Sequence, residues 1–120
     1  MAVTAEQLMR SRYTAFVRGA RDPEAIDHLL RTHPETGQTA AARRKALKDS
    51  CRDIQWLSLK VLDSQNGSPL DQQGTVAFEA HWRDRDRREG VLKECSRFGR
   101  GESGEWLYLD ALSIGDGSAG

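Results

Sequence analysis

The chain has 120 residues, with equal numbers of basic and acidic side chains, 18 of each. A chain of this length fits one domain, and its balanced charge argues against a general nucleic-acid binder and against a protein drawn to acidic membranes. Its apolar runs are only a few residues long, so we expect neither a membrane-spanning segment nor a signal peptide.

The first half of the chain carries the start and stop signals of three helices. Thr4 and Gln7 form a capping box: the Thr4 hydroxyl caps a free backbone amide of the first turn, and the Gln7 side chain reaches back to another free amide. Asp22-Pro23 is a second start signal, because proline suits the first helical position. His33-Pro34 ends that second helix, because the residue before a proline resists helical angles. The predicted helices cover residues 5–18, 23–32 and 39–51.

The second half changes to the alternating pattern of β-strands. A long strand is predicted over residues 54–64, with Leu57, Leu59 and Val61 on one side and Trp56 on the other. The turn signal Asn66-Gly67-Ser68-Pro69 ends this strand. A charged hairpin tip at residues 83–90 separates the second strand from the third. The further predicted strands contain residues 76–82, 92–98 and 106–110.

Three helices followed by four consecutive antiparallel strands is an α+β pattern. We expect the three N-terminal helices to pack on a curved antiparallel sheet of four or more strands that wraps around them as a cone. Residues 1–114 are predicted to form this single domain. Residues 115–120, which are mostly glycine and serine, are expected to be a disordered tail.

One charged side chain interrupts the apolar face of the first predicted helix. At about 100° per residue, Arg12 lies between Leu8 and Phe16 on the face that should meet the core. A buried guanidinium needs partners, because an isolated buried charge is very unfavourable. Strand alternation turns Glu94 and Asp110 to the inside, so we expect Arg12 to reach one of these carboxylates.

Four segments of the sequence carry a likeness to a known family. They are LMRSRYTAFVRG at 8–19, LLRTHP at 29–34, LKECSRFGR at 92–100 and WLYLD at 106–110. Together they resemble the YchJ-like domain of the NTF2-like superfamily, which implies a cone-shaped α+β fold but no biochemical activity that can be transferred. Such domains are usually flanked by cysteine-rich SEC-C zinc motifs, and no such motif occurs within these 120 residues.

The inward faces of the strands predict a small polar cavity in the cone. NTF2-like enzymes place an acid or base and a tyrosine donor there, which the resemblance suggests for Tyr108 and a neighbouring carboxylate. A satisfied buried polar network that sets strand register is the alternative interpretation. The candidate ligand-binding residues are Arg12, Glu94, Ser96, Phe98, Trp106, Tyr108 and Asp110, and no catalytic residue is assigned.

The remaining polar residues predict little further chemistry. The histidines and carboxylates show no metal-ligand spacing, and Cys51 and Cys95 form no CxxC, so we expect no metal and no cofactor. Without a secretion signal, reduced thiols and a cytoplasmic location are expected. We expect His33 to cap the end of the second helix.

The outer face of the sheet should be apolar enough to support assembly. Val91, Cys95, Leu107 and Leu109 alternate away from the predicted cavity, and an exposed apolar face commonly marks an interface. The sequence therefore predicts a non-catalytic module that binds a small ligand, for example an anion, or that assembles as a homodimer. The alternative is a small cofactor-free enzyme, isomerase- or hydrolase-like, that uses a buried carboxylate and Tyr108.

Overall fold

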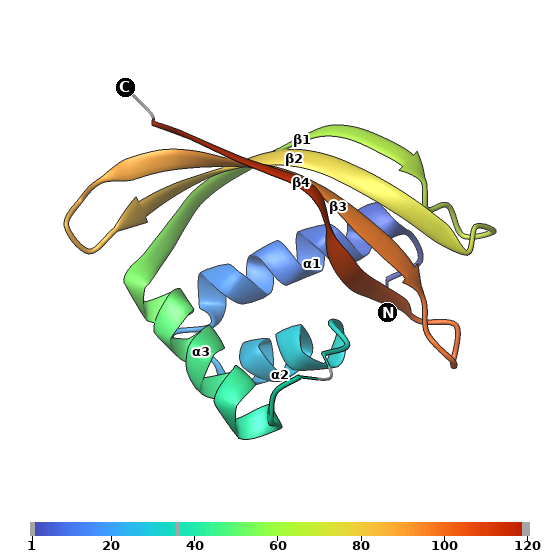
Figure 1. Ribbon diagram of the computed structural model, residues 1–120, viewed down its shortest axis with the longest axis horizontal. Coiled ribbons are helices and arrows are strands. Elements are labelled where there is room, and N and C mark those ends of the chain that lie inside the picture. The colour runs from blue at the N-terminus through green and yellow to red at the C-terminus, as the bar shows by residue number, and fades with distance from the viewer. Residues whose placement is uncertain (1, 36, 119–120) are drawn as a thin grey trace.

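The computed structural model describes residues 2–35 and 37–118, and this part of the chain folds into three helices followed by a four-stranded antiparallel sheet (Figure 1). The strands lie in the order β1-β2-β3-β4, so each pairs with its neighbour in the sequence. The predicted α+β class is confirmed. The helices are α1 (Ala5–Arg18), α2 (Pro23–Arg31) and α3 (Ala40–Asp53), and the strands are β1 (Ile54–Asn66), β2 (Gln73–Asp84), β3 (Glu89–Arg100) and β4 (Trp106–Ser118).

The helices begin where side-chain caps are available. The Thr4 hydroxyl accepts the Gln7 N–H at 3.1 Å, and the Asp22 carboxylate accepts the Glu24 N–H at 3.0 Å. Thr39 caps α3 in the same way. Each cap satisfies a backbone amide that the first helical turn leaves free, so local sequence alone specifies these starts.

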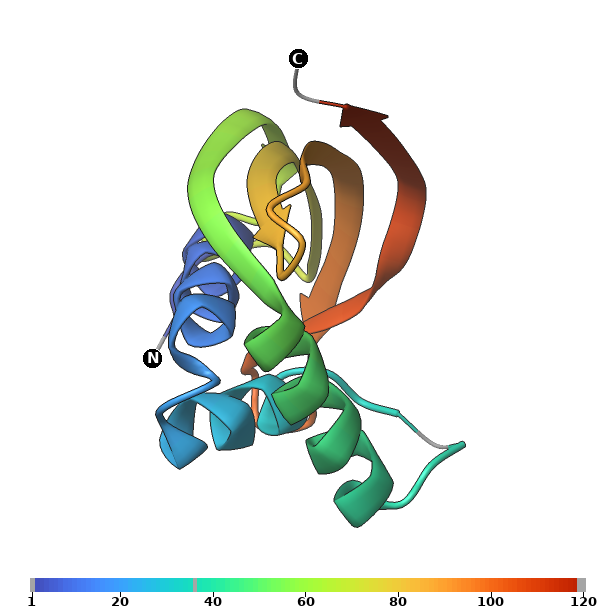
Figure 2. The same cartoon turned by 90° about the vertical axis from the view of Figure 1, so that its left-hand side faces the viewer.

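The three helices lie on the concave side of the curved sheet (Figures 1 and 2). Helix α1 contacts the sheet directly, and α2 and α3 pack on the side of α1 that faces away from it. One apolar core lies between α1 and the sheet, and a second lies among the helices. The first contains Ala5, Leu8, Met9, Val76, Phe98 and Trp106, and the second contains Ala15, Ala25, Ile26, Leu29 and Cys51.

Both edge strands contain two β-bulges, and the extra residue is a leucine each time. The pairing shifts at Leu57 and Leu62 in β1 and at Leu109 and Leu112 in β4. A bulge inserts one residue, bends the strand and reverses the alternation of side chains beyond it. The simple alternation predicted for residues 54–64 is therefore wrong, because the bulge at Leu57 turns Trp56 to the inner side of the sheet.

Strand β4 continues beyond the predicted end of the domain. Its backbone pairs with β3 as far as Ser118, which lies opposite Gly90. The expected disordered tail is thus wrong for residues 115–118, and residues 119–120 lie outside the described residues. The physical reason is that β3 offers unpaired backbone groups along this edge, which outweigh the weak strand propensity of the glycine-rich segment.

Membrane insertion through a helix finds no support in the described residues, since none of their helices is both long and apolar enough to cross a bilayer.

Candidate functional site

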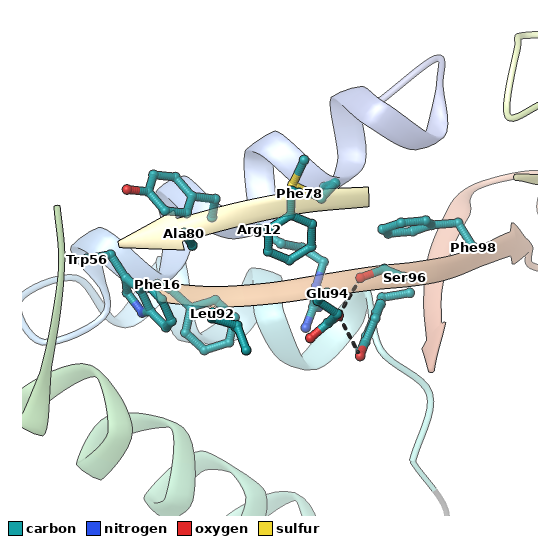
Figure 3. A pocket seen from close by; sticks show the side chains of 12 residues that line it. Arg12, Phe16, Trp56, Phe78, Ala80, Leu92, Glu94, Ser96 and Phe98 are labelled. Carbon is teal, nitrogen blue, oxygen red and sulfur yellow. Dashed lines mark hydrogen bonds between the residues drawn. The ribbon is translucent and has the colours of Figure 1, made fainter. Parts of the chain in front are cut away.

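A cavity of about 200 Å³ opens between α1 and the concave face of the sheet. Its walls are mainly apolar and aromatic, and they include Phe16 from α1, Trp56 from β1 and Phe78 from β2. The four side chains that form its polar floor come from α1, β3 and β4 (Figure 3). This polar floor consists of Arg12, Glu94, Ser96 and Tyr108.

Glu94 lies at the centre of the polar floor because it shares the inner face of β3 with Ser96 and Phe98. One carboxylate oxygen, Oε2, accepts a hydrogen bond from the Ser96 hydroxyl and a second one, 3.3 Å long, from the Tyr108 hydroxyl (Figure 3). In the described part of the chain the other oxygen, Oε1, has no hydrogen-bond donor. The carboxylate thus keeps one acceptor free inside the cavity.

Tyr108 is held from both sides of its backbone by the end of α2. Its N–H donates to the Thr32 carbonyl at 2.7 Å, and its own carbonyl lies 2.9 Å from His33 Nδ1. Burial, followed by the negative charge and hydrogen bond of Glu94, raises the pKa of Tyr108 to about 12. The phenol is therefore protonated at neutral pH and donates to the carboxylate.

The predicted role of His33 as a helix cap is wrong. The backbone N–H of Thr32 bonds to the His28 carbonyl at the end of α2, whereas the His33 ring reaches across to β4. The ring also lies against Tyr108, with their centroids 4.9 Å apart. The His33-Pro34 segment therefore positions a side chain of the polar floor.

Arg12 is buried as predicted, with only 9% of its surface exposed. Its Nη1 donates to the Leu29 carbonyl at 3.0 Å and to the Thr32 hydroxyl at 2.6 Å, and the guanidinium lies 5.0 Å from the centre of the Tyr108 ring. Burial lowers the pKa of Arg12 to about 10, so it remains a cation at neutral pH. The guanidinium is anchored to the end of α2 and points to Glu94 without touching it (Figure 3).

The expectation that Arg12 pairs with Glu94 or Asp110 is wrong, because its hydrogen-bond partners in the described residues are the Leu29 carbonyl and the Thr32 hydroxyl. The placement of Asp110 in the cavity is wrong as well. The bulge at Leu109 turns Asp110 to the outer face, where its side chain is 51% exposed. There it accepts two hydrogen bonds from Arg97, at 3.0 and 2.8 Å, and this pairing lowers the pKa of Asp110. Strand alternation could not reveal the bulge.

Trp106 was also expected to line the cavity, but the structure places it in the core. It is 2% exposed, and its indole N–H donates to the Val3 carbonyl at 3.0 Å. The other five candidate residues, Arg12, Glu94, Ser96, Phe98 and Tyr108, line the cavity together.

Four aromatic side chains of the cavity walls were not among the predicted site residues: Tyr13, Phe16, Trp56 and Phe78. Phe16 follows Arg12 by one helical turn, and Phe78 shares a predicted strand face with Ala80, so both could have been inferred. Trp56 could not, because its inward orientation depends on the bulge at Leu57. The indole Nε1 of Trp56 is buried and has no hydrogen-bond partner among the residues that the structure describes.

The outer face of the sheet is less apolar than predicted. Lys93 Nζ on β3 lies 3.6 Å from Glu79 Oε1 on the neighbouring strand β2, and Arg97 pairs with Asp110. Val91, Cys95, Leu107 and Leu109 are each half-buried. Among the described residues, no three histidine, cysteine or acidic side chains are placed to hold a metal ion.

Comparison with known proteins identifies relatives for nearly the whole chain. A family model described as "YchJ, middle NTF2-like domain" matches residues 4–111. A UPF0225 protein of Streptomyces coelicolor is 43% identical over 110 residues, which are 91% of this chain and 74% of that protein. A UPF0225 protein of Pectobacterium carotovorum is 37% identical over 114 residues, covering 92% of this chain and 67% of that protein.

Two solved structures share the fold. The solution structure of a SEC-C motif containing protein from Rhodopseudomonas palustris superposes with a TM-score of 0.70 and 24% identity, over 94% of this chain and 80% of that one. The epoxide hydrolase/cyclase-like enzyme SalBIII, of salinomycin pyran ring formation, superposes with a TM-score of 0.51 and 14% identity, over 96% of this chain and 98% of that one. At these identities the likeness concerns the fold alone.

Proposed function

The chain belongs to the family of YchJ middle NTF2-like domains, and from that premise we propose that it binds a small, largely apolar molecule in the cavity of its cone. Family membership accounts for the fold, so the function is argued from the cavity itself. The observation that carries the proposal is a polar floor with free hydrogen-bonding capacity beneath apolar walls.

The size and lining of the cavity define the class of ligand. Sites for drug-sized molecules usually enclose about 300–1,000 Å³ and combine apolar walls with a few polar groups. This cavity has the same composition in about 200 Å³, which suits a molecule about the size of one substituted ring.

The hydrogen bonds argue against a purely structural role for the polar floor. A network that only set strand register would satisfy all of its buried polar groups internally. Glu94 instead leaves Oε1 free, and Arg12 is not within 4.0 Å of it in the described structure. The Oε1 atom of Glu94 and the Nε and Nη2 atoms of Arg12 are therefore available to a ligand in the cavity that both residues line.

A fragment titration followed by amide NMR shifts tests binding. We expect toluene, phenol or cyclohexanol to shift the amides of Ser96 and Tyr108. Ala80→Leu, which adds a side chain to a buried wall position, should abolish these shifts. Ala77→Leu is the matched control, because Ala77 precedes Phe78 on β2 and faces away from the cavity. Shifts that survive Ala80→Leu in the folded variant would contradict the proposal.

A small cofactor-free enzyme is the second candidate. It is favoured by the partners of Glu94, which are hydroxyls rather than a directly paired guanidinium. Glu94 could take a proton from the carbon next to a ligand carbonyl, while protonated Tyr108 donates to the oxygen that becomes negative.

Exchange of the α-protons of cyclohexanone in D₂O measures this second candidate directly. Catalysis predicts exchange above the buffer rate that disappears in Glu94→Gln and falls in Tyr108→Phe. Exchange at the buffer rate, with binding intact, would leave the binding module as the function.

A further inference from the structure

We propose that the ligand of the cavity presents a neutral acceptor and donor side by side, as a carboxamide or lactam does, and that this group bridges Arg12 and Glu94. The inference rests on the proposed binding function and specifies the chemistry of its ligand. In this arrangement the ligand carbonyl accepts from the guanidinium, and the ligand N–H donates to the carboxylate.

The free hydrogen-bonding positions of the polar floor lead to this group. Arg12 uses Nη1 for the Leu29 carbonyl and the Thr32 hydroxyl, and its Nε and Nη2 have no partner among the described residues. Glu94 uses Oε2 for two hydroxyls and keeps Oε1 free. Figure 3 shows the two charged ends pointing toward one another, with the dashed bonds of Glu94 on the side away from Arg12.

The separation of the two groups leaves room for a bridging group. No Arg12 nitrogen lies within 4.0 Å of a Glu94 oxygen in the described chain, although both side chains line the same cavity. A donor and an acceptor that sit next to each other but are not bonded to each other match a ligand with the complementary pair. A carboxamide has one carbonyl acceptor and N–H donors in a single plane.

The charge of the polar floor favours a neutral ligand over the anion expected from Arg12 alone. Arg12 contributes one positive charge and Glu94 one negative charge, so the empty site is balanced. A bound carboxylate would leave the buried site with a net negative charge, and a bound amidinium would leave it positive. An uncompensated charge in an apolar enclosure is strongly unfavourable.

Three probes of nearly equal shape test the inference: benzamide, benzoate and benzamidine, with toluene as the apolar reference. Titration calorimetry at pH 7 should show benzamide binding at least about tenfold more tightly than each of the others, since a hydrogen bond to a charged group contributes that much. Benzoate or benzamidine binding as tightly as benzamide would overturn the inference.

The variant Glu94→Gln removes the negative charge of the polar floor and keeps the shape of the side chain. It leaves Arg12 as the only charge of the polar floor, so benzoate should bind at least about tenfold more tightly than to the unmodified chain, and benzamide should lose affinity. Glu102→Gln, at an exposed turn, is the matched control and should leave all affinities unchanged.

The failure of the inference can be told apart from failure of the proposed function. Toluene that binds as tightly as benzamide would refute the amide bridge and leave cavity binding intact. If none of the four probes binds, the proposed function is refuted together with the inference. If Glu94→Gln does not fold, the ranking of probes on the unmodified chain still decides.

Discussion

Replacing Arg12 by methionine removes a buried charge while keeping an unbranched side chain of similar length. The variant loses the hydrogen bonds to the Leu29 carbonyl and the Thr32 hydroxyl and the contact with the Tyr108 ring. It also relieves the desolvation of the guanidinium. The net effect on stability is the difference between these contributions.

The magnitudes can be worked out from the structure. Two hydrogen bonds from a charged donor contribute together roughly 3–6 kcal/mol. Burial lowers the pKa of Arg12 from 12.5 to about 10, which corresponds to roughly 3 kcal/mol against the charged form. The contact of the guanidinium with the Tyr108 ring adds about 1 kcal/mol. We therefore expect Arg12→Met to lower the free energy of unfolding by about 1–4 kcal/mol, mostly below the roughly 3–5 kcal/mol lost when one partner of a buried ion pair is removed.

Urea unfolding followed by the fluorescence of the three tryptophans measures this difference. With a urea dependence of about 1–3 kcal/mol per molar, a loss of that size lowers the midpoint by roughly 1 M. Arg10→Met, at an exposed position of the same helix, is the control and should change stability by less than about 0.5 kcal/mol. An unchanged midpoint for Arg12→Met would refute the role of its hydrogen bonds, and a loss above about 5 kcal/mol would indicate a direct ion pair with Glu94.

Four further predictions concern the tyrosine, the outer face and metals. In Tyr13→Phe, the remaining Tyr108 should titrate by absorbance with a midpoint of about 12; because the folded state holds this proton more tightly, its stabilising contribution is present below pH 10 and is lost as the pH rises through about 12, and a midpoint near 10 would contradict this. Asp110→Asn should leave fragment binding and the urea midpoint unchanged, whereas a loss of binding would indicate that Asp110 lines the cavity. The predicted homodimer should become a monomer in Leu107→Glu combined with Leu109→Glu, and sedimentation of an unmodified chain that is already monomeric would rule the dimer out. Elemental analysis after purification without a metal-binding tag should find no stoichiometric metal, and one equivalent of zinc would show that a site was missed.

Much of the polar floor could be predicted because it lies on regular elements. Arg12 interrupts the apolar face of a capped helix, and Glu94 and Ser96 share a face with Phe98 on β3, which has no bulge where it pairs with β2. A period of 3.6 or 2 residues is enough to orient side chains on such segments. Arg12 could be placed in this way, but its partners could not, because they are a backbone carbonyl and a hydroxyl at the end of another helix.

The sequence by itself determined the order of the elements, the helix starts and the family, because caps, turns and periodicity act over a few residues. Only the tertiary structure decided which side of the sheet Trp56 and Asp110 occupy, since one bulged leucine beside each reverses the alternation. It also decided how far β4 extends, because residues 115–118 are ordered by the unpaired edge of β3 and not by their own propensity. The bulges bend the strands. Both the bulges and the edge pairing depend on contacts with the neighbouring strand, such as Trp56 with Trp82 and Asp110 with Arg97, which lie far apart in the chain.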